Sequence, residues 1–193
     1  MPRIRFYGFG ESYLSRESSY KCLKERHWKG KVEKVDKEAL QKYARLIVRT
    51  GINIQRDQTL VLSAPVECAP FARMLAETAY EEGAREVVMN WNDEISTQIR
   101  YLHASDDVFD EFPEWRKEFF LSCANKGAAF LSVSASDPEL MKDVDPGRIS
   151  RAGKTAQTAL KEYSERLMSN RNTWCVVSVP TAAWAKKVFP GEP

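Results

Sequence analysis

The chain has 193 residues, of which 43% are hydrophobic and 29% charged, and its formal net charge is +2. This length fits one domain, or one domain with an appendage, that buries roughly 70% of its unfolded surface. No apolar run reaches the ~18 residues of a membrane-spanning helix, and the basic N-terminus lacks the apolar segment of a secretory signal. We therefore expect a cytoplasmic protein without a membrane partner.

The first 34 residues are predicted to form a basic, weakly ordered arm. They carry nine Lys and Arg residues and four Glu residues, a net charge of +5. The remaining 159 residues carry twenty Lys and Arg residues and twenty-three Asp and Glu residues, a net charge of −3. The arm has no sustained hydrophobic period, which is typical of poorly ordered segments. Its aromatic residues, such as Trp28, leave a contact with RNA as an alternative. The simpler interpretation is an extension without a nucleic-acid partner.

From Asp36 onward the sequence alternates between helix and strand patterns. Asp36 can cap a helix that stops at Gly51. Residues 59–93 then predict a strand, a crossover helix and a second buried strand, which implies parallel pairing. The strands are predicted at 59–64, 86–91, 128–134 and 173–179, and the later helices at 68–82, 93–103, 113–127, 147–168 and 180–188. We thus predict an α/β fold, a mostly parallel sheet of at least four strands with helices on both faces.

The thiols indicate a reducing compartment. The four cysteines are far apart in the sequence and show no C-x-x-C spacing: Cys22, Cys68, Cys123 and Cys175. Three of them lie in apolar surroundings. This pattern favours reduced, buried thiols over disulfides or a zinc site.

None of the common catalytic or cofactor motifs is complete. The junction after the first strand, 63–67, has no glycine and contains Pro65, which argues against a dinucleotide cradle. Gly153-Lys154-Thr155 has the sequence that ends a phosphate-binding loop, but the loop's first glycine is missing and the tripeptide lies within a helix pattern. The two histidines, His27 and His103, have no neighbours at metal-ligand spacing. We predict no catalytic residue and no metal ligand in this chain.

Polar residues lie at the carboxyl end of each predicted strand. Because the carboxyl ends of parallel strands lie along one edge of a sheet, and ligands bind there, we expect these residues to line a substrate cleft or an interdomain face. The candidates are Glu67, Asn90, Asn92, Asp93, Ser136 and Asp137. Helix capping is the alternative role for Asn92, Ser136 and Asp137, since Asn, Ser and Asp are preferred at helix N-termini.

Six segments in this order carry a family resemblance: YARLIV (43–48), APVECAPFAR (64–73), VMNWND (88–93), EFPEW (111–115), GAAFLSVSASD (127–137) and VPTAAWAKKVF (179–189). Together they resemble the amino-terminal domain of the thermophilic-type metallo-aminopeptidases, the aminopeptidase T and aminopeptidase S group. The resemblance runs from about residue 35 to residue 190, so it divides the chain into the arm 1–34 and an α/β domain 35–193.

The resemblance implies a two-domain, homodimeric enzyme that releases N-terminal residues from peptides at a site with two divalent metal ions. In that family the metal ligands are Glu, His, Tyr and Asp side chains of the carboxyl-terminal domain. This chain ends near the start of that domain, so no ligand or catalytic residue is carried over. We expect the chain to lack the catalytic domain, to hold no metal and to be inactive alone. The alternative is a non-enzymatic binding or regulatory α/β module.

Overall fold

The structure is a computed structural model that describes residues 37–135, 137, 139–181, 184 and 187–188. The predicted arm, its boundary and Ser136 lie outside the described residues. Residues 182–183 and 185–186 of the predicted last turn at 180–188 lie outside them as well.

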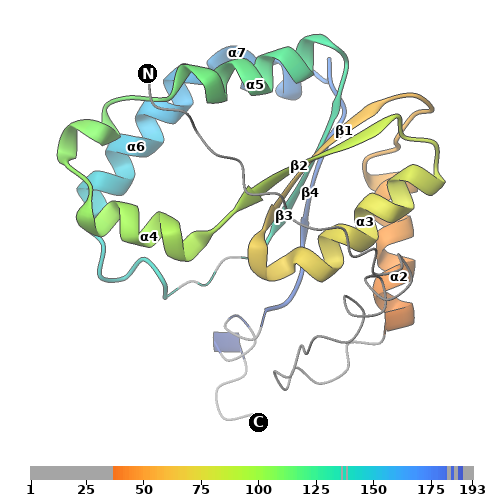
Figure 1. The fold of residues 1–193 in the computed structure, drawn as a ribbon, viewed down its shortest axis with the longest axis horizontal. Coiled ribbons are helices and arrows are strands. Elements are labelled where there is room, and N and C mark those ends of the chain that lie inside the picture. Colours follow the sequence, from red (N-terminus) through yellow and green to blue (C-terminus); the bar gives the residue numbers. More distant parts are fainter. Residues whose placement is uncertain (1–36, 136, 138, 182–183, 185–186, 189–193) are drawn as a thin grey trace, which may run out of the picture. The chain divides into compact units, whose positions relative to one another are not determined.

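The described residues fold around one four-stranded parallel sheet (Figure 1). Its strands are β1 (Thr59–Pro65), β2 (Glu86–Asn92), β3 (Ala129–Ser134) and β4 (Trp174–Ser178), in the spatial order β2-β1-β3-β4. The two central strands are rich in buried β-branched and aliphatic residues, as a sheet covered on both faces requires. All four predicted strands are confirmed, as is the parallel pairing.

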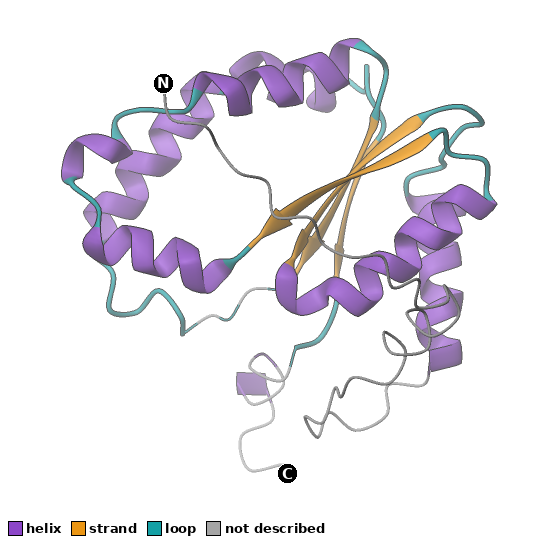
Figure 2. Ribbon diagram, in the orientation of Figure 1, coloured by secondary structure: helices purple, strands orange, loops and turns teal. Residues whose placement is uncertain are grey.

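Helices connect the strands (Figure 2). They are α2 (Lys37–Leu46) with a π-helical turn (Ile47–Gly51), a 3₁₀ turn (Val66–Cys68) leading into α3 (Ala69–Glu81), α4 (Glu94–His103), a 3₁₀ turn (Asp106–Phe109), α5 (Glu114–Asn125), α6 (Pro146–Ala159) and α7 (Lys161–Met168). Gly83 and Gly127 follow α3 and α5 with φ of 94° and 76°, the left-handed conformation that ends helices. Within the described residues no helix is both long and apolar enough to cross a membrane.

The prediction of one helix over 147–168 is wrong. The segment is broken at Leu160, whose φ of −96° and ψ of 15° lie outside the helical region. Thr158 donates its hydroxyl hydrogen to the Lys154 carbonyl, four residues earlier, at 2.9 Å, and such bonds bend helices. The break lets α6 and α7 pack on different parts of the molecule, which a continuous hydrophobic period does not reveal.

Two hydrophobic clusters cover the two faces of the sheet, as predicted. The α2–α3 face holds the larger cluster, in which Leu60, Leu62 and Leu131 are fully buried against α2 and α3. The α5–α7 face holds a smaller cluster centred on Val61 and Phe130, under side chains of α5 and α7. Figure 1 shows these helix pairs on opposite sides of the sheet.

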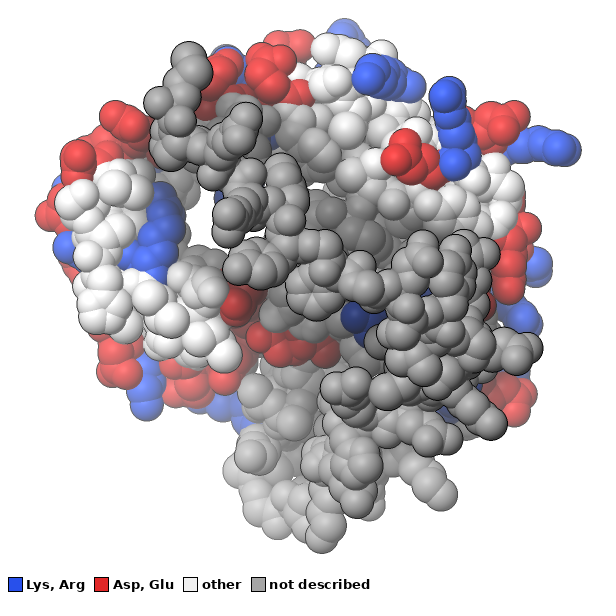
Figure 3. Space-filling model, in the orientation of Figure 1, with Lys and Arg blue, Asp and Glu red and all other residues white. Residues whose placement is uncertain are grey.

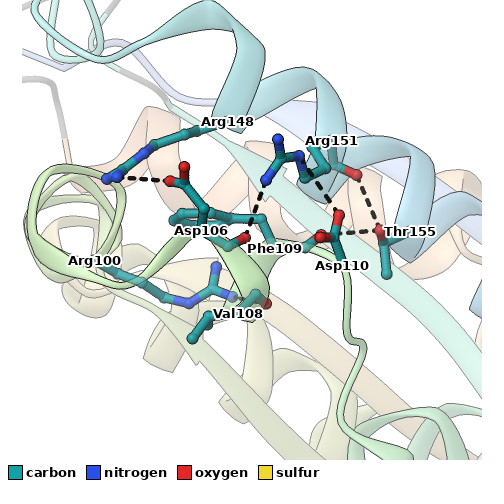
Figure 4. Close-up of polar contacts among 8 residues, drawn as sticks. All are labelled: Arg100, Asp106, Val108, Phe109, Asp110, Arg148, Arg151 and Thr155. Atoms are coloured by element: carbon teal, nitrogen blue, oxygen red, sulfur yellow. Dashed lines mark hydrogen bonds and ion pairs between the residues drawn. The ribbon is translucent and has the colours of Figure 1, made fainter.

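A separate packing unit joins α4 and α6 (Figure 4). Phe109 is completely buried and stacks on Tyr101 with ring centroids 5.3 Å apart. From α6, Arg148 donates to the Tyr101 carbonyl at 2.7 Å and pairs with Asp106 at 2.7 Å, while Thr155 donates to the Phe109 carbonyl at 2.9 Å. These contacts fix α4 relative to α6 and so help to position the side chains of α4.

Candidate functional site

On the α5–α7 face of the sheet, the side chains change from apolar to polar along the strands. Side chains alternate between the two faces, so Val61 and Phe130 are followed on this face by Ser63 and Ser132. Asn90 lies beside Ser63 in the register and donates its Nδ2 hydrogen to Ser63 Oγ at 2.9 Å. These three polar residues are only partly buried. On β1, β2 and β3, the half of this face nearest the carboxyl ends of the strands is therefore polar, whereas Val176 of β4, which pairs with Ser132, is apolar.

A groove lies at the same end of the sheet, between β2, α4 and α5. It has a volume of about 350 Å³, and we call it the β2–α4–α5 groove. Its lining residues are Asn90, Trp91, Asn92, Asp93, Ser96, Thr97, Arg100, Trp115, Arg116 and Phe119. Three of the predicted site residues, Asn90, Asn92 and Asp93, are thus brought together in one concave surface.

Asp93 is the N-cap of α4. Its Oδ1 accepts hydrogen bonds from the backbone amides of Ile95 and Ser96 at 3.0 and 3.2 Å, and its Oδ2 accepts one from the Ser96 hydroxyl at 2.6 Å. These bonds, first of all that from the Ser96 hydroxyl, lower the pKa of Asp93. The suggested capping role of Asn92 is wrong, since Asn92 is the last residue of β2. Both oxygens of the Asp93 carboxylate are engaged in the helix cap.

Two arginines bring positive charge to the groove. The Arg100 guanidinium donates to the Val108 carbonyl at 3.2 Å and lies 4.9 Å from the centroid of the Phe109 ring (Figure 4). Among the described residues, the side chain of Arg116 makes no hydrogen bond or ion pair. Figure 3 shows basic side chains inward of a rim of uncharged ones in the region of α4 and α6. The groove thus combines cationic donors, amides and aromatic surfaces.

The other predicted site residues lie elsewhere along the edge of the sheet. Glu67 is exposed in the 3₁₀ turn after β1, and its carboxylate, with that of Glu94, adds to burial in raising the pKa of the Cys68 thiol. Asp137 donates its backbone amide hydrogen to Glu94 Oε2 at 3.2 Å and accepts one from the Glu139 amide at 2.9 Å. Neither Glu67 nor Asp137 lines the β2–α4–α5 groove.

Comparison with known proteins places this fold in a family. Residues 36–193 match the family described as "Thermophilic metalloprotease (M29)". The chain belongs to this family. It is 51% identical over 150 residues to "Aminopeptidase 2" of Geobacillus stearothermophilus and 39% identical over 155 residues to "Aminopeptidase AmpS" of Bacillus subtilis (strain 168). These alignments cover 78% and 80% of this chain but only 36% and 38% of the two relatives.

A solved member of the thermophilic metalloprotease family has the same fold. "Wild-type AmpT from Thermus thermophilus" superposes with a TM-score of 0.76 at 34% sequence identity, and the match covers 81% of this chain and 40% of that one. The chain therefore spans under half the length of the relatives it matches. The match corresponds to the amino-terminal portion of these proteins.

The metal ions of this metalloprotease family do not fit the described residues. Among them, no group of three or more His, Cys, Asp and Glu side chains is arranged to hold an ion. The side chains that converge at the candidate site are instead Arg100, Trp115, Arg116 and the asparagines of β2. Sequence reasoning missed the two arginines. The segment 111–115 carried the family resemblance and contains Trp115, but its place in the groove depends on how α5 packs.

Proposed function

We propose that this chain forms the amino-terminal, non-catalytic part of a metallo-aminopeptidase, which releases N-terminal residues from peptides by two-metal hydrolysis. One observation carries the proposal: the chain is 51% identical to a protein described as an aminopeptidase, yet spans 36% of its length. In this proposal the two divalent ions bind outside the chain, in the catalytic part of a homodimeric enzyme. The free thiols Cys68, Cys123 and Cys175 support a cytoplasmic location.

The chain would contribute one wall of the peptide cleft. The polar end of the sheet supports this role, because ligand sites in parallel α/β sheets lie beyond the carboxyl ends of the strands. Asn90 and Asn92 offer amide donors and acceptors for a peptide backbone. Glu67, Asp93, Ser136 and Asp137 complete the proposed edge, which would face either the peptide or the catalytic part.

A chimera tests this function directly. The matching part of the Geobacillus stearothermophilus relative is replaced by residues 36–193 of this chain, and cleavage of leucine p-nitroanilide is measured with and without divalent cations. We expect the chimera to be active only with the cation, and the chain alone to be inactive with or without it. An inactive but folded chimera would favour the binding-module alternative, and metal-dependent cleavage by the chain alone would refute the proposal.

Variants of the chimera locate the cleft. Replacing Asn90 and Asn92 together by Ala is expected to lower kcat/KM for peptides by about 10-fold, which corresponds to about 1.4 kcal/mol of lost transition-state stabilisation. The matched control is Asn125→Ala, an exposed residue at the end of α5. Equal kcat/KM values in the double variant and the control would place the cleft elsewhere.

A further inference from the structure

We propose that the β2–α4–α5 groove binds a carboxylate group of a peptide through Arg100 and Arg116. The inference rests on the proposed function and deepens it, since it names a substrate class: short peptides that present a free carboxylate to this groove. An aminopeptidase cuts at the amino end of its substrate. A receptor for the opposite end would orient the peptide and favour particular lengths.

The distribution of charge in and around the groove supports the proposal. Arg148 and Arg151 of the same region are paired with Asp106 and Asp110, at 2.7 and 3.5 Å. Arg100, by contrast, has no carboxylate partner among the described residues and retains N–H donors that the Val108 carbonyl does not use. Arginine binds carboxylates through paired hydrogen bonds. An arginine without a carboxylate partner can therefore accommodate an added anion, and Arg100 and Arg116 of the groove meet this condition among the described residues.

The negative charge in the groove does not occupy these arginines. Among the described residues, Asp93 supplies the only carboxylate that lines the groove, and both Asp93 oxygens accept hydrogen bonds within the cap of α4. Arg116 has no side-chain partner among the described residues. The described lining residues therefore carry two guanidinium groups and one carboxylate, and that carboxylate is already hydrogen-bonded within the helix cap.

Arg100 is held in position before any ligand binds. Its guanidinium lies against the ring of Phe109, which is fully buried and stacked on Tyr101. A preordered side chain loses less conformational entropy on binding than a free one. This arrangement suits a fixed receptor for a small anion.

The remaining walls suit the end of a peptide. Asn90 and Asn92 can pair with backbone amides, and the lining residues Trp91 and Trp115, which are 41% and 73% exposed, offer aromatic surface to an apolar side chain. The volume of about 350 Å³ is at the small end of the roughly 300–1,000 Å³ of ligand pockets. Arginine and tryptophan also bind nucleic acids, so the binding test includes an oligonucleotide as a competing ligand class.

Binding measurements on the 193-residue chain test the proposal. Isothermal titration compares three ligands: trileucine, trileucine amide and the amide of dileucyl-glutamate. We expect trileucine to bind about 10-fold or more tightly than its amide, since a charge-assisted pair contributes at least about 1.4 kcal/mol. If the glutamate-bearing amide binds like trileucine, the groove also accepts a side-chain carboxylate, which supports the same chemistry; if not, the terminal carboxylate is the ligand.

Arg116→Gln is the decisive variant, because Arg116 is exposed and its side chain has no described partner whose loss would disturb folding. We expect the preference for trileucine over its amide to disappear in Arg116→Gln and to weaken in Arg116→Lys. It should persist in the matched control Arg85→Gln, at the opposite end of β2. Circular dichroism verifies that each variant is folded.

Three outcomes would overturn the proposal: equal affinity for trileucine and its amide, no binding of either at millimolar concentration, or tighter binding of a short oligothymidylate, which would indicate a nucleic-acid surface. The chimera assay uses an anilide without a carboxylate, so it reports the proposed function separately. An active chimera without carboxylate preference would refute only the groove assignment. A preference in an inactive chimera would refute only the enzymatic assignment.

Discussion

The two faces of the sheet differ in how far their apolar cover extends. On the α2–α3 face, apolar side chains continue from Leu60 through Leu62 to Ala64 along β1, all buried under α2 and α3. On the α5–α7 face the apolar cover ends at Val61, and Ser63 follows. Along β1, one face is therefore apolar throughout, whereas the other is apolar for half its length and polar for the rest. The contrast is consistent with the proposal that the polar half serves binding rather than stability.

Truncating one residue on each face gives the largest expected contrast. Leu62→Ala should lower the free energy of unfolding by about 2–5 kcal/mol, because it leaves a cavity in a fully buried cluster. Ser132→Ala, on the polar half of the other face, should change it by less than about 0.5 kcal/mol. Urea unfolding of both variants measures the difference. Similar losses in the two variants would refute the contrast between the faces.

A buried amide holds together the apolar half of the α5–α7 face. Asn172 is 3% exposed, and its Nδ2 donates to the carbonyls of Ala124 and Ala128 at 3.0 and 2.9 Å. Asn172→Ala leaves both carbonyls without this donor and should cost about 1–3 kcal/mol. Urea unfolding measures this loss, with Asn125→Ala, a substitution at an exposed position, as the control. A loss no larger than that of the control would show that water replaces the amide.

The smallest effect is expected from pH. Burial, with a smaller contribution from Cys123, raises the pKa of Tyr163 from 10.0 to about 12. The fold favours the protonated phenol, so its contribution to stability is complete below pH 10 and is lost as pH rises through 12. Between pH 10 and 12, the free energy of unfolding should fall less steeply with pH for Tyr163→Phe than for the wild type. Parallel slopes would show that this phenol titrates normally.

The sequence predicted the fold better than the site. Short apolar runs and helical patterns, with helix stops at Gly83 and Gly127, located the strands and most helices, because those signals are local. The break at Leu160 was missed, since the apolar period continues through it without interruption. Asn90, Asn92 and Asp93 were found because they lie at the carboxyl end of a strand. Arg100 and Arg116 were not, since only tertiary packing brings α4 and α5 to that strand.

β4 has a consequence for handling the isolated chain. It pairs only with β3 among the described strands, and its Trp174 and Val176 are 39% and 58% exposed. An unpaired strand edge with apolar side chains is a template for intermolecular sheet formation, which natural proteins suppress with charges or covering segments. We therefore expect the purified chain to aggregate as its concentration is raised. Val176→Lys would place a charge on this edge and so reduce aggregation.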